Sequence, residues 1–266
     1  MANFNPNELA LEKVRSVEEY DPSTLELVGR YTYIEDPILN FSNSEREVTD
    51  AFGASIMTFY DADKGSFSFS NSLHSLDLLA SQFGTEKEVA TSENKINVPV
   101  SEIVAINSEG KAVLKYTPVG TEGAEIPYVK VINNNNTFGE TYEISSTSAE
   151  GKFTLDVGTK TITLPSGTTG KIFVNYEKAS DSAVRVAKET DKDPLVRTLL
   201  IHAIFHDPCN KNIVYSGVIR APRAQIDSTS VDVNLKSDGK HAAKYKLEKT
   251  YCDDSARLVE IFVSND

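Results

Sequence analysis

Two histidines and a cysteine, His202, His206 and Cys209, form the pattern H-x3-H-x2-C, and imidazole and thiolate are the usual ligands of zinc. The run TLLIHAIFH at 198–206 favours a strand, on which residues four apart are separated by roughly 13 Å. It also lacks the glutamate of the helical H-E-x-x-H motif. We therefore expect two partly covered strand histidines before a turn at Asp207-Pro208, with no metal and no cofactor.

The motifs of nucleophilic and phosphate chemistry are absent from the sequence, which contains no G-x-S-x-G, G-x-x-x-x-G-K-[ST] or G-x-G-x-x-G. The carboxylates are scattered over turns, and the chain has no tryptophan for a sugar-stacking platform. We expect a protein that is not an enzyme. A glycan hydrolase with paired carboxylates stays open as an alternative, because such pairs meet only in the fold.

The clearest positioning element is the stretch 64–89, where a strand runs into a helix. Phe67 and Phe69 alternate with serines, and a period of 3.6 residues follows. Asn71 or Ser72 is the expected N-cap, and Gly84 suits the left-handed residue that closes a helix. We expect the apolar face of this helix to be buried on a sheet, so that Leu76→Asp abolishes folding or assembly. That face carries Leu73, Leu76, Leu79, Ala80 and Phe83.

The residues before this stretch read as an extended arm, with one or two helical turns at 8–14 and a strand that ends at Asp36-Pro37. The run 54–60 is expected to turn at 61–65 and pair antiparallel with the strand at Phe67 and Phe69. From about 93 to 182, short apolar runs alternate with Gly, Asn and Pro turns, which predicts an inserted unit built only from strands.

Strands return after Pro194. Val231, Val233 and Leu235 alternate with polar residues, and Asp238-Gly239 is a strong hairpin signal. The fold class that we predict is mainly β: a β-sandwich or barrel flanked by one α-helix, with an inserted small all-β unit. The barrel domain is expected at 1–92 and 183–266, and the insert at 93–182.

Composition limits the classes of partner. The 266 residues include 27 Lys and Arg against 39 Asp and Glu, a formal charge of −12, which opposes adhesion to nucleic acid. No apolar run approaches the roughly 20 residues that cross a bilayer, and no secretory signal is recognisable, so we expect no membrane partner and assembly in the cytoplasm of the producing cell. Cys209 and Cys252 are expected to be free thiols.

Lysines gather near the C-terminus, where Lys244 and Lys246 face away from the apolar side of their strand. Outward lysines commonly form a solvated face or prevent edge-to-edge aggregation. A second interpretation is that this basic strand meets acidic strands of a neighbouring copy and favours head-to-tail association into rings.

Three long segments are similar to a known family. The run from Glu45 to Val89, EREVTDAFGASIMTFYDADKGSFSFSNSLHSLDLLASQFGTEKEV, precedes an insert containing KTITLPSGTTGKIFVNYE. A third run, from LLIHAIFHDPC to KLEKTYC, ends at Cys252. Together they resemble the tail tube (major tail) proteins of tailed bacteriophages, in the order of elements rather than in any catalytic signature.

The resemblance implies a virion structural protein of the viral tail, in which hexameric rings stack into a hollow tube for DNA ejection. Its partners would be itself, the tape measure, terminator and possible sheath proteins, and DNA in transit. Six copies at −12 each carry −72, which suits a conduit to which DNA does not adhere. We expect the inter-subunit residues to come from the N-terminal arm and from the edges of the C-terminal strands. They are Phe4, Leu9, Leu11, Lys244, Lys246, Val259, Ile261 and Val263.

Alternatives remain at this stage. A head-decoration or head–tail connector protein shares the structural character of a tail tube protein and differs in its place in the particle. A host-surface adhesion module would expose variable turns such as 133–136 at a tip.

Overall fold

The computed structural model describes residues 8–133, 135–227, 235–236, 239–250 and 257–265. The chain forms two compact units. Unit 1 combines Met1–Lys87 with Val186–Asp266, and unit 2 is Glu88–Arg185. The insert predicted at 93–182 falls inside unit 2.

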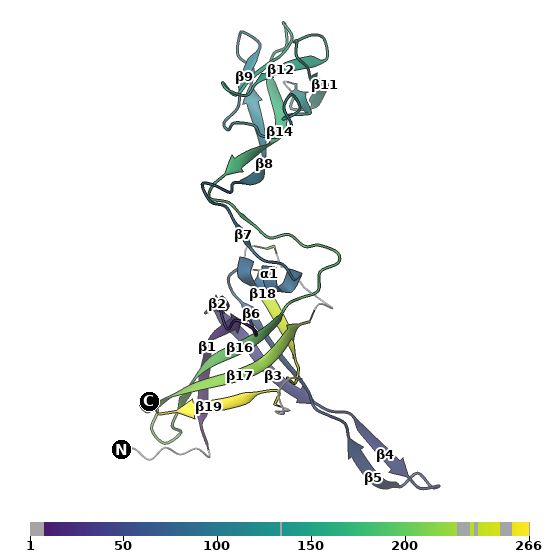
Figure 1. Ribbon diagram of the computed structural model, residues 1–266, viewed down its shortest axis with the longest axis vertical. Helices are drawn as coiled ribbons and strands as arrows, with labels where there is room; N and C mark the ends of the chain where they lie inside the picture. The colour runs from purple at the N-terminus through teal and green to yellow at the C-terminus, as the bar shows by residue number, and fades with distance from the viewer. Residues whose placement is uncertain (1–7, 134, 228–234, 237–238, 251–256, 266) are drawn as a thin grey trace. The chain divides into compact units, whose positions relative to one another are not determined.

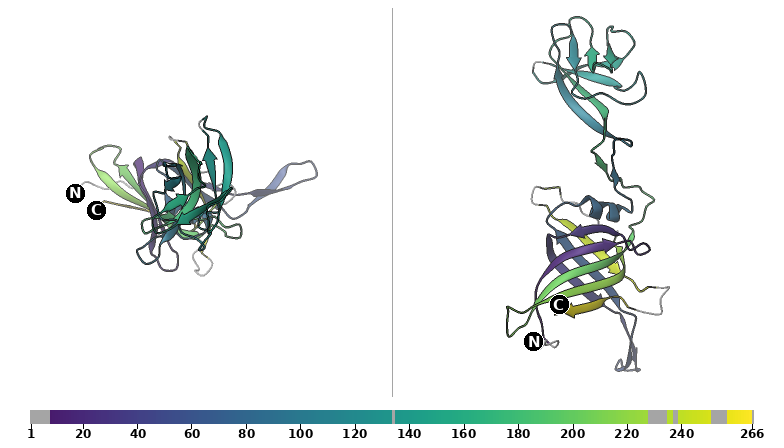
Figure 2. Two further views of the ribbon diagram at one scale, coloured as in Figure 1. Left: turned by 90° about the horizontal axis from the view of Figure 1, so that it is seen from above. Right: turned by 60° about the vertical axis from the view of Figure 1, so that its left-hand side comes forward.

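Unit 1 is a strongly curved, nearly closed antiparallel sheet that forms a barrel (Figures 1 and 2). Its strand order is β2-β1-β16-β17-β18-β6-β3, and β19 pairs with the first half of β17. This architecture confirms the predicted mainly β class with one helix. The strands are β1 (Ala10–Tyr20), β2 (Leu27–Tyr31), β3 (Ile34–Ser42), β6 (Lys64–Asn71), β16 (Val196–His206), β17 (Val214–Ile226), β18 (His241–Leu247) and β19 (Glu260–Ser264).

The barrel core follows from alternation along its strands. In β6 the buried residues are every second one, and β18 repeats the pattern opposite it. Phe67, Phe69 and Tyr245 stack there, with centroids 5.6–6.4 Å apart, and Tyr31 lies 5.8 Å from Phe69. Burial of these rings supplies much of the apolar stabilisation of unit 1.

The helix α1 (Leu76–Phe83) begins later than predicted. Its N-cap is Ser75, whose hydroxyl accepts the N–H of Leu78, while Asn71 remains in β6. The predicted closure at Gly84 is confirmed, with φ of 72°. A side chain there would also collide with the carbonyl oxygen of Asp193, 1.9 Å from an ideal Cβ.

The predicted apolar face of α1 is wrong in part. Because the helix starts at residue 76, Leu73 lies in the connection and is 54% exposed, and Leu76 is 47% exposed. Leu79 and Phe83 are half-buried, and Ala80 is buried as expected. The main apolar contact is instead Leu78, which is fully buried. Two polar residues, Ser81 and Gln82, complete the buried face.

Three further predictions in the first 70 residues are wrong. No strand ends at Asp36-Pro37, because β2 ends at Tyr31 and β3 runs through both residues from Ile34 to Ser42. Residues 8–14 form no helical turn, since β1 runs from Ala10 and pairs along its whole length with β16. The strand predicted at 54–60 does not pair with Phe67 and Phe69. It is β5 (Ser55–Tyr60), and its partner is β4 (Glu45–Thr49), which precedes it in the chain. Strand β6 pairs with β3 and β18 instead.

Unit 2 is a separate seven-stranded sheet of order β8-β14-β10-β11-β12-β13-β9, with its own buried core that includes Phe153, Ile162 and Val174. The chain enters and leaves it through a short pair, β7 (Glu88–Val89) with β15 (Val184–Arg185). The other strands are β8 (Ile96–Ala105), β9 (Lys111–Val113), β10 (Tyr128–Ile132), β11 (Phe138–Ile144), β12 (Lys152–Asp156), β13 (Thr161–Thr163) and β14 (Lys171–Ser180).

Some predictions lie outside the described residues: the arm residue Phe4, the strand positions Val231 and Val233, the first residue of the Asp238-Gly239 turn, and Cys252. Cys209 is described, and it is a free, exposed thiol.

Candidate functional site

The most unusual surface of unit 1 is the hairpin formed by β4 and β5, called here the projecting hairpin (residues 43–62). The ladder between β3 and β6 ends where Ser42 faces Lys64, and the chain continues as β4 and β5, which pair only with each other. The N–H of Asp61 donates to the carbonyl of Ser44 and joins the two ladders. The hairpin therefore extends the β3–β6 ribbon beyond the barrel (Figure 1).

One face of the projecting hairpin is apolar. Val48 lies opposite Met57, and Arg46 lies opposite Phe59 with its guanidinium 5.5 Å from the ring centroid. All four side chains are exposed, at 45% for Val48, 54% for Met57 and 46% for Phe59. At the tip, Phe52 is 97% exposed.

The opposite face combines acidic and apolar groups. Glu45 lies opposite Tyr60 and Glu47 opposite Thr58, and Ile56 shares this face because side chains alternate along β5. Tyr60 is 67% and Ile56 65% exposed. The carboxylate of Asp50 accepts the N–H groups of Phe52 and Ala54, which fixes the turn.

A ribbon of this kind lacks an obvious source of stability on its own. Two strands without a third or a covering element are at best marginally stable in water. Exposed apolar groups this close together mark sites of protein association on soluble proteins. The projecting hairpin is thus the candidate functional site, and its exposed apolar side chains are of the kind that associate with another protein.

A second surface feature lies where the hairpin leaves the barrel. A groove of about 880 Å³, called here the lysine groove, runs between β3, β6, β18 and the residues before β19. The carboxylate of Asp227 is almost buried there and pairs with Lys246 at 3.0 Å and Lys244 at 3.7 Å. Phe41, Leu247, Leu258 and Val259 supply apolar lining, and Lys64 and Lys249 add positive charge.

The structure distributes the predicted inter-subunit residues over several places. Lys244, Lys246 and Val259 meet in the lysine groove. Leu9 precedes β1 and is half-buried, and Leu11 in β1 is 58% exposed opposite Phe205. In β19, Ile261 is 60% exposed and Val263 half-buried. Their role in assembly stays a prediction.

The histidines of the H-x3-H-x2-C pattern have separate partners. His202 Nε2 lies 3.2 Å from Glu18, and His206 lies 2.6 Å from Glu12 through Nε2 and 2.7 Å from the carbonyl of Lys211 through Nδ1. The Glu12 carboxylate raises the pKa of His206, while the pKa of Glu12 is lowered by the same bond. Within the described residues, no group of three or more His, Cys, Asp or Glu side chains could hold a metal.

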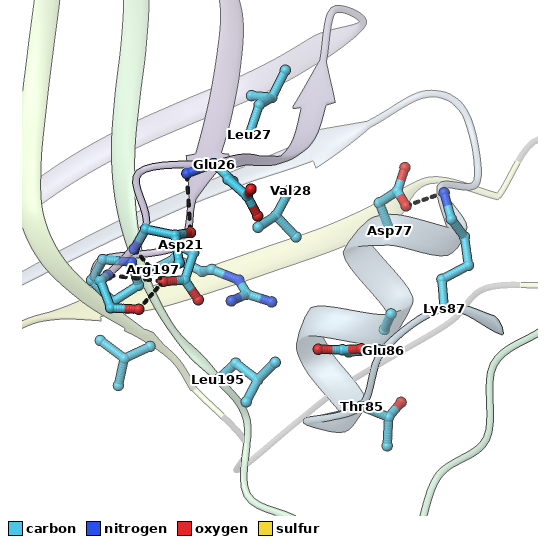
Figure 3. Close-up of a pocket in the computed structure, with 15 residues that line it drawn as sticks. Asp21, Glu26, Leu27, Val28, Asp77, Thr85, Glu86, Lys87, Leu195 and Arg197 are labelled. Carbon is cyan, nitrogen blue, oxygen red and sulfur yellow. Dashed lines mark hydrogen bonds and ion pairs between the residues drawn. The ribbon is translucent and has the colours of Figure 1, made fainter.

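A cavity of about 610 Å³ lies between α1 and the residues around β2 (Figure 3). Two of its carboxylates are already engaged, because Asp77 pairs with Lys87 and Asp21 caps its own turn. Bonds from the Ser23 hydroxyl and from the N–H groups of Thr24 and Ser23 lower the pKa of Asp21 to about 2. Both carboxylates thus have partners within unit 1.

Behind this cavity, Arg197 reaches α1 and donates from Nε and Nη2 to the Ser81 hydroxyl at 3.3 Å. That hydroxyl donates to Glu19, which is fully buried and also accepts from Tyr31 and Tyr245. Burial raises the pKa of Glu19, and the three hydroxyl donors oppose the rise. Every polar group of this cluster has a partner within unit 1, so the cluster fixes the helix on the barrel.

A protein-family model of tube proteins matches residues 9–261, nearly the whole chain. The chain belongs to the YomU/Tube protein family. The match spans both units, so the inserted sheet lies within the region that the family model covers. A comparison with curated proteins gives no match.

In this Tube-family chain, sequence reasoning missed the projecting hairpin, although a signal existed. EREVT and SIMTFY are both strand-like and are separated by a short run containing Gly53, which is the pattern of a hairpin. Because residues 61–65 also have a turn-like sequence, SIMTFY was predicted to pair with the strand after it rather than with EREVT before it.

Among the described residues, no helix has the length and apolarity needed to span a bilayer.

Proposed function

We propose that this protein is a bacteriophage virion structural protein that assembles with its own copies into stacked hexameric rings, forming the tail tube. The observation that carries the proposal is the projecting hairpin, which exposes six large apolar side chains on a ribbon of two strands. Membership of the YomU/Tube family supports a structural role in a tube. The exposed residues are Val48, Phe52, Ile56, Met57, Phe59 and Tyr60.

The net negative charge of the chain supports a role as a conduit for DNA. A ring of six copies carries about −72, and an acidic wall does not retain DNA that moves along it. The protein would reside in the tail of the virion and contact tape measure and terminator proteins, with a sheath if the tail contracts. DNA would pass through it without a stable complex.

The hairpin gives a direct test. Ile56→Ser with Tyr60→Ser removes two apolar side chains that are 65% and 67% exposed in the monomer, so unit 1 should fold as before while tubes fail to form. The matched control is Ile103→Ser with Val113→Ser in unit 2, two side chains that are 63% and 56% exposed. Sedimentation velocity and negative-stain microscopy report assembly, and circular dichroism reports the fold.

We expect tubes from the unsubstituted chain and from the control, and monomers from the hairpin variant. Normal tubes from the hairpin variant would show that the hairpin does not drive assembly. Single rings that never stack, in the unsubstituted chain, would favour a head–tail connector over a tail tube.

A further inference from the structure

We propose that the lysine groove of one copy receives the projecting hairpin of a second copy, with the Glu45, Glu47, Ile56 and Tyr60 face turned into the groove. This inference rests on the proposed self-assembly and names the two surfaces that meet. It is carried by the charges and apolar side chains of the groove and the hairpin.

The groove is locally basic in an acidic chain. Its lysines are Lys64, Lys244, Lys246 and Lys249, and its carboxylates are Asp63, Asp227 and Glu248. The charge of Glu248 is balanced by Arg223 outside the lining, with Arg223 Nε 2.8 Å from its carboxylate. Lys64 and Lys249 have no ion-pair partner within the described residues. The groove therefore attracts a negative ligand although the chain carries −12.

The hairpin provides the complementary charge. Residues 43–62 contain Glu45, Glu47, Asp50 and Asp61 against the single cation Arg46, a net charge of −3. Arg46 lies on the other face, where it covers Phe59. The face turned to the groove thus bears two carboxylates and no cation.

Apolar complementarity points the same way. Tyr60 lies opposite Glu45, and Ile56 lies on the tip side of the Glu47–Thr58 pair; both are about two-thirds exposed in the monomer. The lining of the groove also includes the apolar residues Phe41, Leu258 and Val259, with the buried Leu247 beside them. Burying two such side chains against an apolar lining is favourable, and charges at the rim fix their register.

The fold directs the hairpin to a different copy. Ser42 and Lys64 form both the root of the hairpin and one edge of the groove, and the ribbon leads away from the barrel at this point (Figures 1 and 2). Two different surfaces therefore meet, one from each copy. Such heterologous contacts propagate head to tail and close into a ring when the rotation permits.

A charge exchange on the full chain tests the inference. Lys64→Glu with Lys249→Glu reverses two groove charges that are not tied to Asp227, and Glu45→Lys with Glu47→Lys reverses the hairpin. Each double variant alone should raise the protein concentration needed for assembly at least about tenfold, because like charges then face each other. The quadruple variant should return to within about threefold of the unsubstituted chain.

The control is Lys95→Glu with Lys171→Glu, which makes the same change in net charge on unit 2 and should leave assembly unchanged. If the unsubstituted chain forms tubes and the groove variant assembles as well as this control, the groove is not the docking site while the proposed function stands. Failure of the quadruple variant to recover, with its fold intact by circular dichroism, would likewise overturn the pairing. Absence of tubes from the unsubstituted chain would contradict the proposed function itself.

Discussion

His241 should make the docking of α1 on the barrel sensitive to acid. The side chain is 1% exposed, and both of its ring nitrogens are used. Nδ1 accepts the N–H of Ser75 at 3.4 Å, and Nε2 lies 2.8 Å from the side-chain amide oxygen Oε1 of Gln82. The amide of Gln82 in turn donates to the carbonyl of Ala242. This arrangement requires a neutral ring with its proton on Nε2, because a protonated Nδ1 cannot accept the backbone bond.

The magnitude follows from linkage. Burial, with a smaller contribution from the nearby His74, lowers the pKa of His241 from 6.5 to about 4. Between these values the unfolded chain binds a proton that the folded chain does not, so the free energy of unfolding falls as the pH falls. The difference of 2.5 units corresponds to about 3 kcal/mol, or roughly 300-fold in the opening equilibrium. The loss is complete below about pH 4.

Hydrogen exchange of residues 76–83 measures this opening without interference from unit 2. Exchange rates are corrected for intrinsic pH dependence and compared at pH 7, 6, 5 and 4. The protection of α1 should fall by about two orders of magnitude or more across this range. The matched variant His241→Gln cannot titrate, and its α1 protection should change much less with pH.

Glu19 and Glu35 also titrate near the helix, and both are retained in the variant. Burial raises the pKa of Glu19, and bonds from Lys240 and Ser72 lower that of Glu35. Their effects therefore cancel when the two pH profiles are subtracted. A difference profile that is flat between pH 4 and 6.5 would refute the argument, as would a proton NMR titration of His241 near 6.5.

Three further predictions concern packing and domain structure. Leu78→Ala should lower the free energy of unfolding by about 2–5 kcal/mol and Leu76→Ala by less than about 1, measured by urea denaturation, because only Leu78 is buried. Glu19→Ala should cost about 3–5 kcal/mol, whereas Glu12→Ala, at an exposed position of the same strand, stays within about 1; equal losses would contradict the assigned burial. Deletion of residues 90–183, with β7 joined to β15 by a short Gly-Ser turn, should leave unit 1 folded by NMR, since each unit has its own core; a molten spectrum would show dependence on unit 2.

The sequence predicted the fold class because alternation is visible locally. The alternation of Phe67 and Phe69 with serines predicted strand β6, and the alternation of Tyr245 and Leu247 with polar residues predicted strand β18. The same alternation places His241 on the core side of β18 and Glu19 on the same side of β1 as Val17. The burial of both residues was therefore predictable from their positions in the alternation, although their polar character argues against it.

What the sequence could not supply is long-range pairing. The contact of β1 with β16 joins residues nearly 200 positions apart, and no local pattern encodes it. The helix register failed for a related reason: its buried face includes Ser81 and Gln82, whose partners Arg197, Glu19 and His241 come from distant strands. Locally, the apolar positions Leu73 and Leu76 fit a helical stripe better than Ser81 and Gln82 do. The stripe through Leu73 and Leu76 is nevertheless not the buried face.

In the proposed assembly, copies of this chain build a tube through the projecting hairpin. Cryo-electron microscopy of the assembled full-length protein tests it most directly, because a reconstruction shows both the symmetry and the path of residues 43–62. We expect stacked rings of six copies around an open axis, with each hairpin in contact with another copy. Particles that remain monomeric under all assembly conditions, or tubes in which the hairpins contact only solvent, would contradict it.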